Sequence, residues 1–216
     1  MSIYSEKHRE LQASFDSQAL AERLESIIVK TEIGAVEQAF IESREFLFLS
    51  TITPDGGPTV SFKGGAPGFV QVLNEKQIAF PNYNGNGMFF STGNLSMNPS
   101  IGILFMDFEH PHRIRFHGNA QLSSDKEILA RFPEAELVVI VALDKLWVNC
   151  PRYIPKMQKV KSSVNVPKEG EQTPLAEWKR LEAFHDVLPD KDRQRIKDEG
   201  GPIDMTNFPK NIIENT

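Results

Sequence analysis

The chain has 216 residues, of which 40% are hydrophobic and 25% charged, the composition of an ordinary globular protein. Lysine and arginine number 24 against 29 aspartates and glutamates; the resulting net charge of −5 gives no general attraction to nucleic acid or an anionic membrane. With one cysteine, Cys150, a polar N-terminus and no apolar run of roughly 20 residues, we expect a cytoplasmic protein without nucleic-acid or membrane partners.

The first part of the chain has the apolar spacing of helices. Apolar side chains recur at three- and four-residue steps from about Ser5 to Lys30, which predicts a helix, and a second short helix is predicted from about Ala35 to Ser43. We therefore assign residues 1–44 to N-terminal helices that pack on the domain that follows.

Short apolar runs separated by turn residues make up the middle of the chain. Pro54, Asp55, Gly56 and Gly57 form a turn signal between two such runs and predict a hairpin. Residues 87–98 are predicted to form a short helix that stops at Pro99. The predicted strands are 45–53, 58–62, 69–73, 77–80, 101–108, 113–122 and 137–146, with 147–153 following the last. This spacing predicts an antiparallel barrel or sandwich over residues 45–154.

Beyond this domain the composition becomes polar. Residues 155–216 are expected to form a C-terminal extension with one helix, predicted over Leu175–Leu188, followed by a charged tail from Pro189.

Two segments offer groups that suit an anion or a polar ligand. Ser61 and Lys63 stand at a strand end before two glycines, where an ammonium and backbone N–H groups suit an anion. The segment from Pro81 to Asn94 holds many amides and hydroxyls on a loop that opens a helix. Taken singly, each is explained at least as well by a solvated lysine before a turn and by a plain turn-rich loop.

Other candidate residues are weaker. Arg113 and Arg115 would share one strand face, which fits an anion, an acidic partner or simple solvation. His110 and His112 lack a further ligand at metal-site spacing, so no metal is expected. Cys150 is expected to be structural, since no histidine lies near it in sequence.

Four strings in this order resemble the pyridoxamine 5′-phosphate oxidase-like family of FMN-binding split barrels, over roughly Phe40 to Ile154. They are FLFLSTITPDGGPTVSFKGGAPGF, IAFPNYNGNGMFFSTGNLSMNPSIGILFMDF, RIRFHGNAQL and VNCPRYIP. The resemblance implies a mainly β protein with flanking helices, an antiparallel split β-barrel, and a homodimer with FMN at the subunit interface.

The resemblance also implies which positions contact the cofactor. Ser61 and Lys63 match flavin contacts on the second barrel strand, and Arg152 and Tyr153 match rim positions near the partner's flavin. Positions that match the ring, the ribityl chain and the phosphate-proximal loop are Phe80, Pro81, Asn82, Asn86, Ser91 and Asn94.

This sequence departs from the pyridoxamine phosphate oxidases themselves. They carry an arginine shortly before the strand lysine, where this chain has Pro58 to Phe62, and an Arg/Lys pair in the phosphate loop. Their C-terminal Arg-x-His motif has no counterpart in the tail ending FPKNIIENT. FMN binding is therefore expected, and oxidation of pyridoxamine phosphate is not.

Three functions remain open on the sequence. The first is an FMN-dependent oxidoreductase with an unknown small-molecule substrate and no residue that stands out as an acid or base. The second is a non-catalytic module that holds FMN or haem for sensing or storage. The third is an interaction protein with an empty barrel, in which the C-terminal helix and tail dock a partner.

Overall fold

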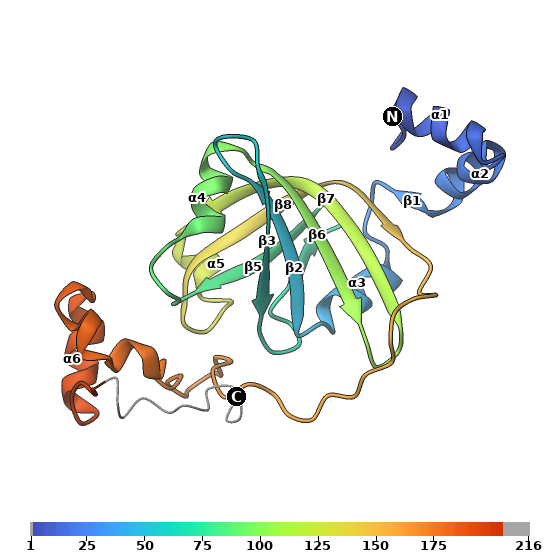
Figure 1. Ribbon diagram of the computed structural model, residues 1–216. Helices are drawn as coiled ribbons and strands as arrows, with labels where there is room; N and C mark the ends of the chain where they lie inside the picture. Colours follow the sequence, from blue (N-terminus) through green and yellow to red (C-terminus); the bar gives the residue numbers. More distant parts are fainter. Residues whose placement is uncertain (1, 205–216) are drawn as a thin grey trace. The chain divides into compact units, whose positions relative to one another are not determined.

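The computed structural model describes residues 2–204 as two compact units, one ending at Lys159 and the other beginning at Val160. The first unit is built on an eight-stranded antiparallel sheet that curls into a barrel (Figure 1). The strand order is β3-β2-β6-β7-β8-β5-β4, and β1 pairs with the end of β8. The strands are β1 Val29–Lys30, β2 Phe46–Ile52, β3 Pro58–Gly64, β4 Gln71–Asn74, β5 Gln77–Tyr83, β6 Ser100–Asp107, β7 His112–Ser123 and β8 Ala135–Val148. The mainly β, antiparallel barrel expected from the sequence is confirmed.

Alternation of apolar side chains explains why these segments form a barrel. In β2, Leu47 and Leu49 are buried and their neighbours are only half-buried, as a strand with one face toward a core requires. The inward side chains of β2, β5, β6, β7 and β8 form one continuous core that includes Phe80, Phe105 and Phe116.

The β7–β8 pairing contains a bulge between His117 and Gly118. A Cβ on Gly118 would come within 2.2 Å of the backbone carbonyl oxygen of Ala142 on β8. Only glycine allows the two backbones to approach this closely.

Helices flank the barrel. α3 (Ala35–Glu42) contacts β4, and α4 (Phe90–Met97) contacts β2 and β7; α5 (Lys126–Leu129) leads into β8. The single helix predicted from Ser5 to Lys30 is instead two helices, α1 (Glu6–Ser14) and α2 (Gln18–Ile28). The break falls at Asp16, whose φ of 51° lies in the left-handed region and cannot continue a helix.

β8 also differs from its prediction. It begins at Ala135 and continues through Trp147 to Val148, and Pro151 lies in a turn beyond its end.

The second unit corrects the predicted C-terminal helix. Residues 175–188 contain two short 3₁₀ helices, Glu177–Arg180 and Glu182–Val187, and an α-helix, α6 (Asp190–Asp198), follows them. Pro189 explains the shift, because proline fixes the φ of the residue that begins a helix and cannot continue one. Lys179 and Asp192 form a buried ion pair of 2.8 Å that joins a 3₁₀ helix to α6. The last part of the predicted extension, residues 205–216, lies outside the described residues.

No helix within residues 2–204 is long and apolar enough to cross a membrane.

Candidate functional site

The inner face of β3 carries polar side chains at the edge of a barrel interior that is largely apolar. Ser61 pairs with Leu49 and Lys63 with Leu47, both of which point into the core, so Ser61 and Lys63 face inward too. Val60 and Phe62 alternate with them and point outward, where they are 71% and 62% exposed. The strand therefore presents a hydroxyl and an ammonium to the interior at one edge of the sheet.

The first turn of α4 lies against these side chains. Ser91, which is buried, lies 3.1 Å from Ser61, oxygen to oxygen. Asn94 donates its side-chain N–H to Thr51 Oγ1 at 3.1 Å, and Thr51 Oγ1 lies 2.9 Å from Thr59 Oγ1. These bonds hold α4 on the polar face of β2 and β3, so its first backbone N–H groups lie close to Ser61.

Lys63 is half-buried and has no hydrogen bond or ion pair with any residue between 2 and 204. Burial lowers the pKa of its ammonium because the charged form loses solvation. Lys63 lies two positions beyond Ser61 on one strand face, roughly 7 Å away along the strand. A cation without a counter-ion beside hydroxyls and a helix N-terminus is an arrangement suited to an anion such as a phosphate.

The β5 segment supplies fewer free groups than the sequence suggested. Phe80 is 1% exposed and belongs to the core, and Pro81 is buried on the opposite face. Asn82 is half-buried and donates to the carbonyl oxygen of Tyr83 at a long 3.5 Å. Phe80 and Pro81 are therefore restricted to backbone contacts with a ligand, whereas the amide of Asn82 can contribute. Their assignment to a cofactor stays a prediction.

Asn86 stands in the exposed loop before α4. Its side-chain oxygen accepts the backbone N–H of Met88 at 3.1 Å, the pattern of an Asx turn. The next residues lead into Phe89, whose φ of 47° is left-handed and sets the direction in which α4 begins. Asn86 thus shapes the loop, and a direct ligand contact stays a prediction.

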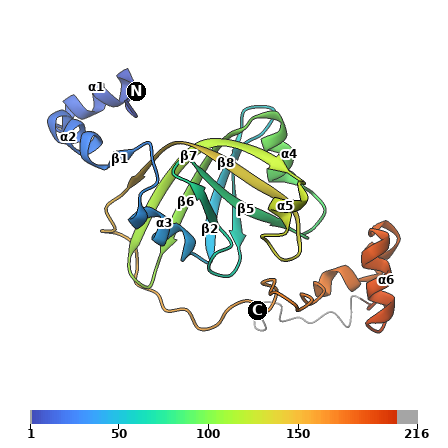
Figure 2. The same cartoon turned by 180° about the vertical axis from the view of Figure 1, so that it is seen from behind.

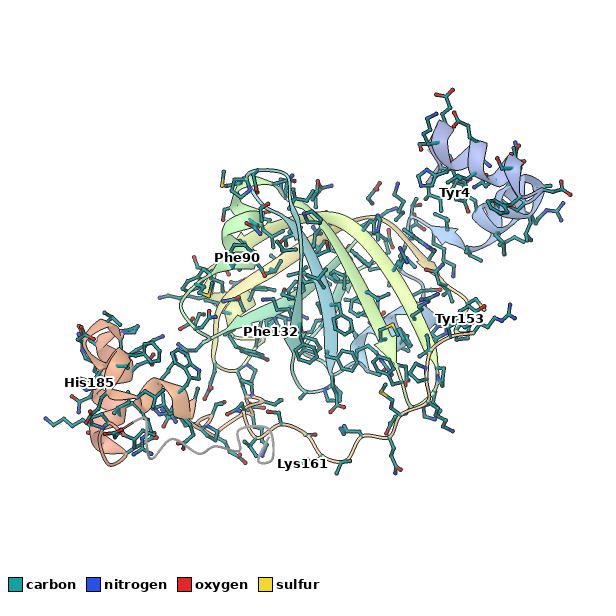
Figure 3. The ribbon with its side chains drawn as sticks, viewed as in Figure 1. Tyr4, Phe90, Phe132, Tyr153, Lys161 and His185 are labelled. Atoms are coloured by element: carbon teal, nitrogen blue, oxygen red, sulfur yellow. The ribbon has the colours of Figure 1, made fainter. Side chains whose placement is uncertain are left out.

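Arg152 and Tyr153 are not brought to this site within one chain. Both are exposed; Tyr153 is 86% exposed, and the guanidinium of Arg152 lies 5.4 Å from the centre of its ring. Figure 3 shows Tyr153 and Phe90, which opens α4, well apart on opposite sides of the barrel. A role for Arg152 and Tyr153 at the site would require a second subunit.

Two residues of the polar face, Thr51 and Thr59, were not predicted from the sequence. Thr51 is buried at 1% exposure and links Asn94 to Thr59. The available signal was Thr51 itself, a polar residue at an inward position of β2 where Leu47 and Leu49 precede it.

Arg113 and Arg115 point outward from β7, on one face as predicted. Among residues 2–204 no group of three or more metal-ligating side chains comes together.

The sequence matches the family described as pyridoxamine 5′-phosphate oxidase over residues 34–145. No curated protein matches the chain. Among solved structures, HupZ of Group A Streptococcus is 18% identical, with a TM-score of 0.43, covering 54% of this chain and 93% of its own. An FMN-binding protein of Syntrophomonas wolfei is 11% identical, with a TM-score of 0.42, covering 65% of this chain and 97% of its own.

Proposed function

Since the chain belongs to the pyridoxamine 5′-phosphate oxidase family, we propose that it is an FMN-binding oxidoreductase that acts as a homodimer on a small-molecule substrate. The observation that carries the proposal is the half-buried Lys63, which has no anionic partner among residues 2–204 and lies beside Ser61. The cytoplasmic location expected from the composition stays a prediction.

The groups present fit FMN. Its phosphate suits Lys63, the hydroxyls of Ser61 and Ser91, and the backbone N–H groups that open α4. The amide of Asn82, half-buried at the end of β5, suits the ribityl hydroxyls or the polar edge of the ring. The exposed Phe90 offers apolar cover for the flat ring system.

When bound, the flavin supplies hydride or electron transfer. The residues of this chain orient it: Lys63 holds the phosphate, and the Ser61–Ser91 contact keeps α4 against β3. We assign Arg152 and Tyr153 to the flavin of the partner subunit, because their exposure leaves them available for a neighbour.

An exposed aromatic surface supports the dimer. Phe46 and Phe62 stack with ring centres 5.5 Å apart, and Phe48 meets Phe62 edge to face at 6.2 Å. These rings cover the outer side of β2 and β3, where Phe62 and Val60 are largely exposed. A patch of aromatic side chains in water is typical of a protein–protein interface.

A non-catalytic flavin carrier is the second candidate. The hydrogen-bonded polar set of the site consists of four hydroxyls and one amide, from Thr51, Thr59, Ser61, Ser91 and Asn94. None of these groups titrates near neutral pH, as a general acid or base must. Turnover would then rest on the flavin and the substrate alone.

Titration of the full-length protein with FMN and with riboflavin tests the proposal. We expect FMN to bind more tightly than riboflavin, because only FMN carries a phosphate for Lys63. Equal affinities would contradict the assigned phosphate site, and no uptake of either flavin would refute the function. Reduction of the bound flavin by a nicotinamide cofactor, followed by reoxidation, would favour the oxidoreductase over the carrier. Light scattering measures the oligomeric state.

A further inference from the structure

The N-terminal hairpin, formed by α1 and α2, has its polar and apolar sides reversed relative to an ordinary helical pair. The contacts between its helices are ionic: Arg9 on α1 lies 3.2 Å from Glu22 and 3.5 Å from Glu25 on α2. Glu25 also accepts from Ser2, and the guanidinium of Arg9 lies over Tyr4. The side that the two helices turn toward each other is therefore polar.

The apolar side chains of the hairpin are left exposed. The exposed fractions are 62% for Leu11, 80% for Phe15, 62% for Leu20, 42% for Leu24 and 64% for Ile27. These residues produced the helical periodicity of the sequence, so the hairpin is amphipathic. Its apolar side is left exposed by the other residues between 2 and 204. A second molecule must cover this surface if it is to be buried.

The connection to the barrel limits which surfaces the hairpin can cover. α2 ends at Ile28 and β1 begins at Val29, so no linker lets the hairpin turn back. β1 is fixed by its pairing with Leu146 and Trp147 at the end of β8. Figure 2 shows the hairpin leaving the sheet through β1.

We infer that the hairpin of each chain covers the outer sheet face of a second copy of this protein. The outer sheet face is the row of outward side chains that the strand registers place across β3, β2, β6 and β7: Phe62, Phe48, Leu104 and Arg115. Phe62 is 62% exposed and Arg115 is exposed, so the row offers an apolar part and a basic part.

Charge complementarity favours this occupant. Residues 2–28 contain five carboxylates against three basic side chains, Lys7, Arg9 and Arg23. The outer sheet face continues from Arg115 past His117 to Lys145, with one carboxylate, Asp144, beside Lys145. Burial and the two neighbouring cations lower the pKa of His117, so the positive charge of this face comes from Arg115 and Lys145. A hairpin with an apolar side and a net charge of −2, from five carboxylates and three basic side chains, thus meets an apolar face that carries Arg115 and Lys145, and both surfaces belong to the same chain.

The arrangement is reciprocal, because in a two-fold dimer each hairpin reaches the other subunit. The inference rests on the proposed dimer and adds where the hairpin lies in it. It makes no use of Lys63 or of the flavin site.

Photocrosslinking of the full-length protein tests where the hairpin lies. p-Benzoylphenylalanine replaces Phe15, and this chain is equilibrated with a large excess of wild-type protein labelled with nitrogen-15. After irradiation, mass spectrometry identifies the crosslinked peptides. We expect labelled peptides from β2, β3, β6 or β7, since only a partner chain carries the label.

Other crosslinks would overturn the inference. Unlabelled barrel peptides would place the hairpin on its own chain, and labelled α1–α2 peptides would indicate that two hairpins pair with each other. The absence of any crosslink between chains would also overturn it. If wild-type protein is dimeric and binds FMN in these cases, the proposed function stands and only the inference fails.

A charged substitution gives a second measurement. Phe15→Glu places a carboxylate on the apolar side of the hairpin and should raise the dimer dissociation constant about tenfold or more. Ser14→Glu is the matched control, because it adds the same charge at an exposed polar position one residue earlier. Equal dimer affinity of the two variants would contradict the inference.

Discussion

Lys63→Met separates two effects of Lys63: its contribution to FMN binding and the destabilisation of the folded protein by its half-buried charge. Methionine keeps an unbranched side chain of similar length and removes the charge together with the N–H donors of the ammonium. A charge-assisted hydrogen bond contributes about 1.5–3 kcal/mol, so the substitution should raise the FMN dissociation constant about 10- to 150-fold. Riboflavin lacks the phosphate, and its affinity should stay unchanged.

The same variant should make the flavin-free protein more stable. Burial lowers the pKa of Lys63, which means that the folded state disfavours the charged ammonium. Below the lowered pKa both folded and unfolded chains are protonated, and the folded chain bears the full cost of desolvation. The cost disappears as pH rises to the ordinary value of 10.5, where the unfolded chain also loses the proton. The stabilising effect of Lys63→Met should therefore be largest at neutral pH and vanish in alkaline solution.

Fluorescence titration with both flavins and urea unfolding at neutral and alkaline pH measure these effects. Lys126→Met, which removes an exposed lysine from α5, is the control and should change neither quantity. FMN affinity within twofold of the wild type, in a variant that is folded, would refute the phosphate role. A variant less stable than the wild type at neutral pH would refute the assignment of Lys63 as a desolvated cation.

Three further predictions concern the fold. Gly118→Ala should destabilise the protein by about 1–3 kcal/mol in urea unfolding, because its Cβ would overlap the carbonyl oxygen of Ala142 on β8. Gly93→Ala is the control: this glycine lies within α4, a Cβ there would meet no atom within 4 Å, and the substitution should stabilise the protein by about 0.5–1 kcal/mol. Burial alone would raise the pKa of Asp107, but hydrogen bonds from backbone N–H groups and the ion pair with Arg44 outweigh burial and lower this pKa. The ionised carboxylate should therefore stabilise the protein above pH 3.8, and this stabilisation should be lost as the pH falls through the lowered pKa. Asp107→Asn should therefore flatten the acid side of the stability profile; an unchanged profile would contradict this. Lys179→Met should cost the second unit about 3–5 kcal/mol by leaving the buried Asp192 unpaired, and adding Asp192→Leu should recover most of it, as thermal unfolding would show.

The sequence alone determined the class of fold. Alternating apolar residues with turn signals between them predict antiparallel strands, because a strand with one buried face must alternate. The observed strands β2, β3, β6 and β7 follow these signals closely. The predicted helix bounds were wrong where a single residue redirects the backbone, as Asp16 does between α1 and α2 and Pro189 does before α6.

The candidate site was only partly determined by the sequence. Ser61 and Lys63 share an inward face because strand periodicity requires it, and this part could be derived from their spacing. That Ser91 lies against Ser61 depends on the packing of α4 on β3, a contact across 30 positions of the chain that no local pattern specifies. Burial of Phe80, likewise, follows from the strands around β5 and not from its own segment.

The N-terminal hairpin shows most directly which features the sequence determines and which depend on tertiary contacts. The apolar spacing of Leu11, Phe15, Leu20 and Leu24 is written in the sequence and predicts amphipathic helices. The sequence pattern does not show in which direction that apolar side points, because the direction depends on the Arg9 ion pairs that turn the polar sides of the two helices toward each other. Periodicity fixes which residues share a face, whereas only tertiary contacts decide whether that face meets the chain's own core or is left for a partner.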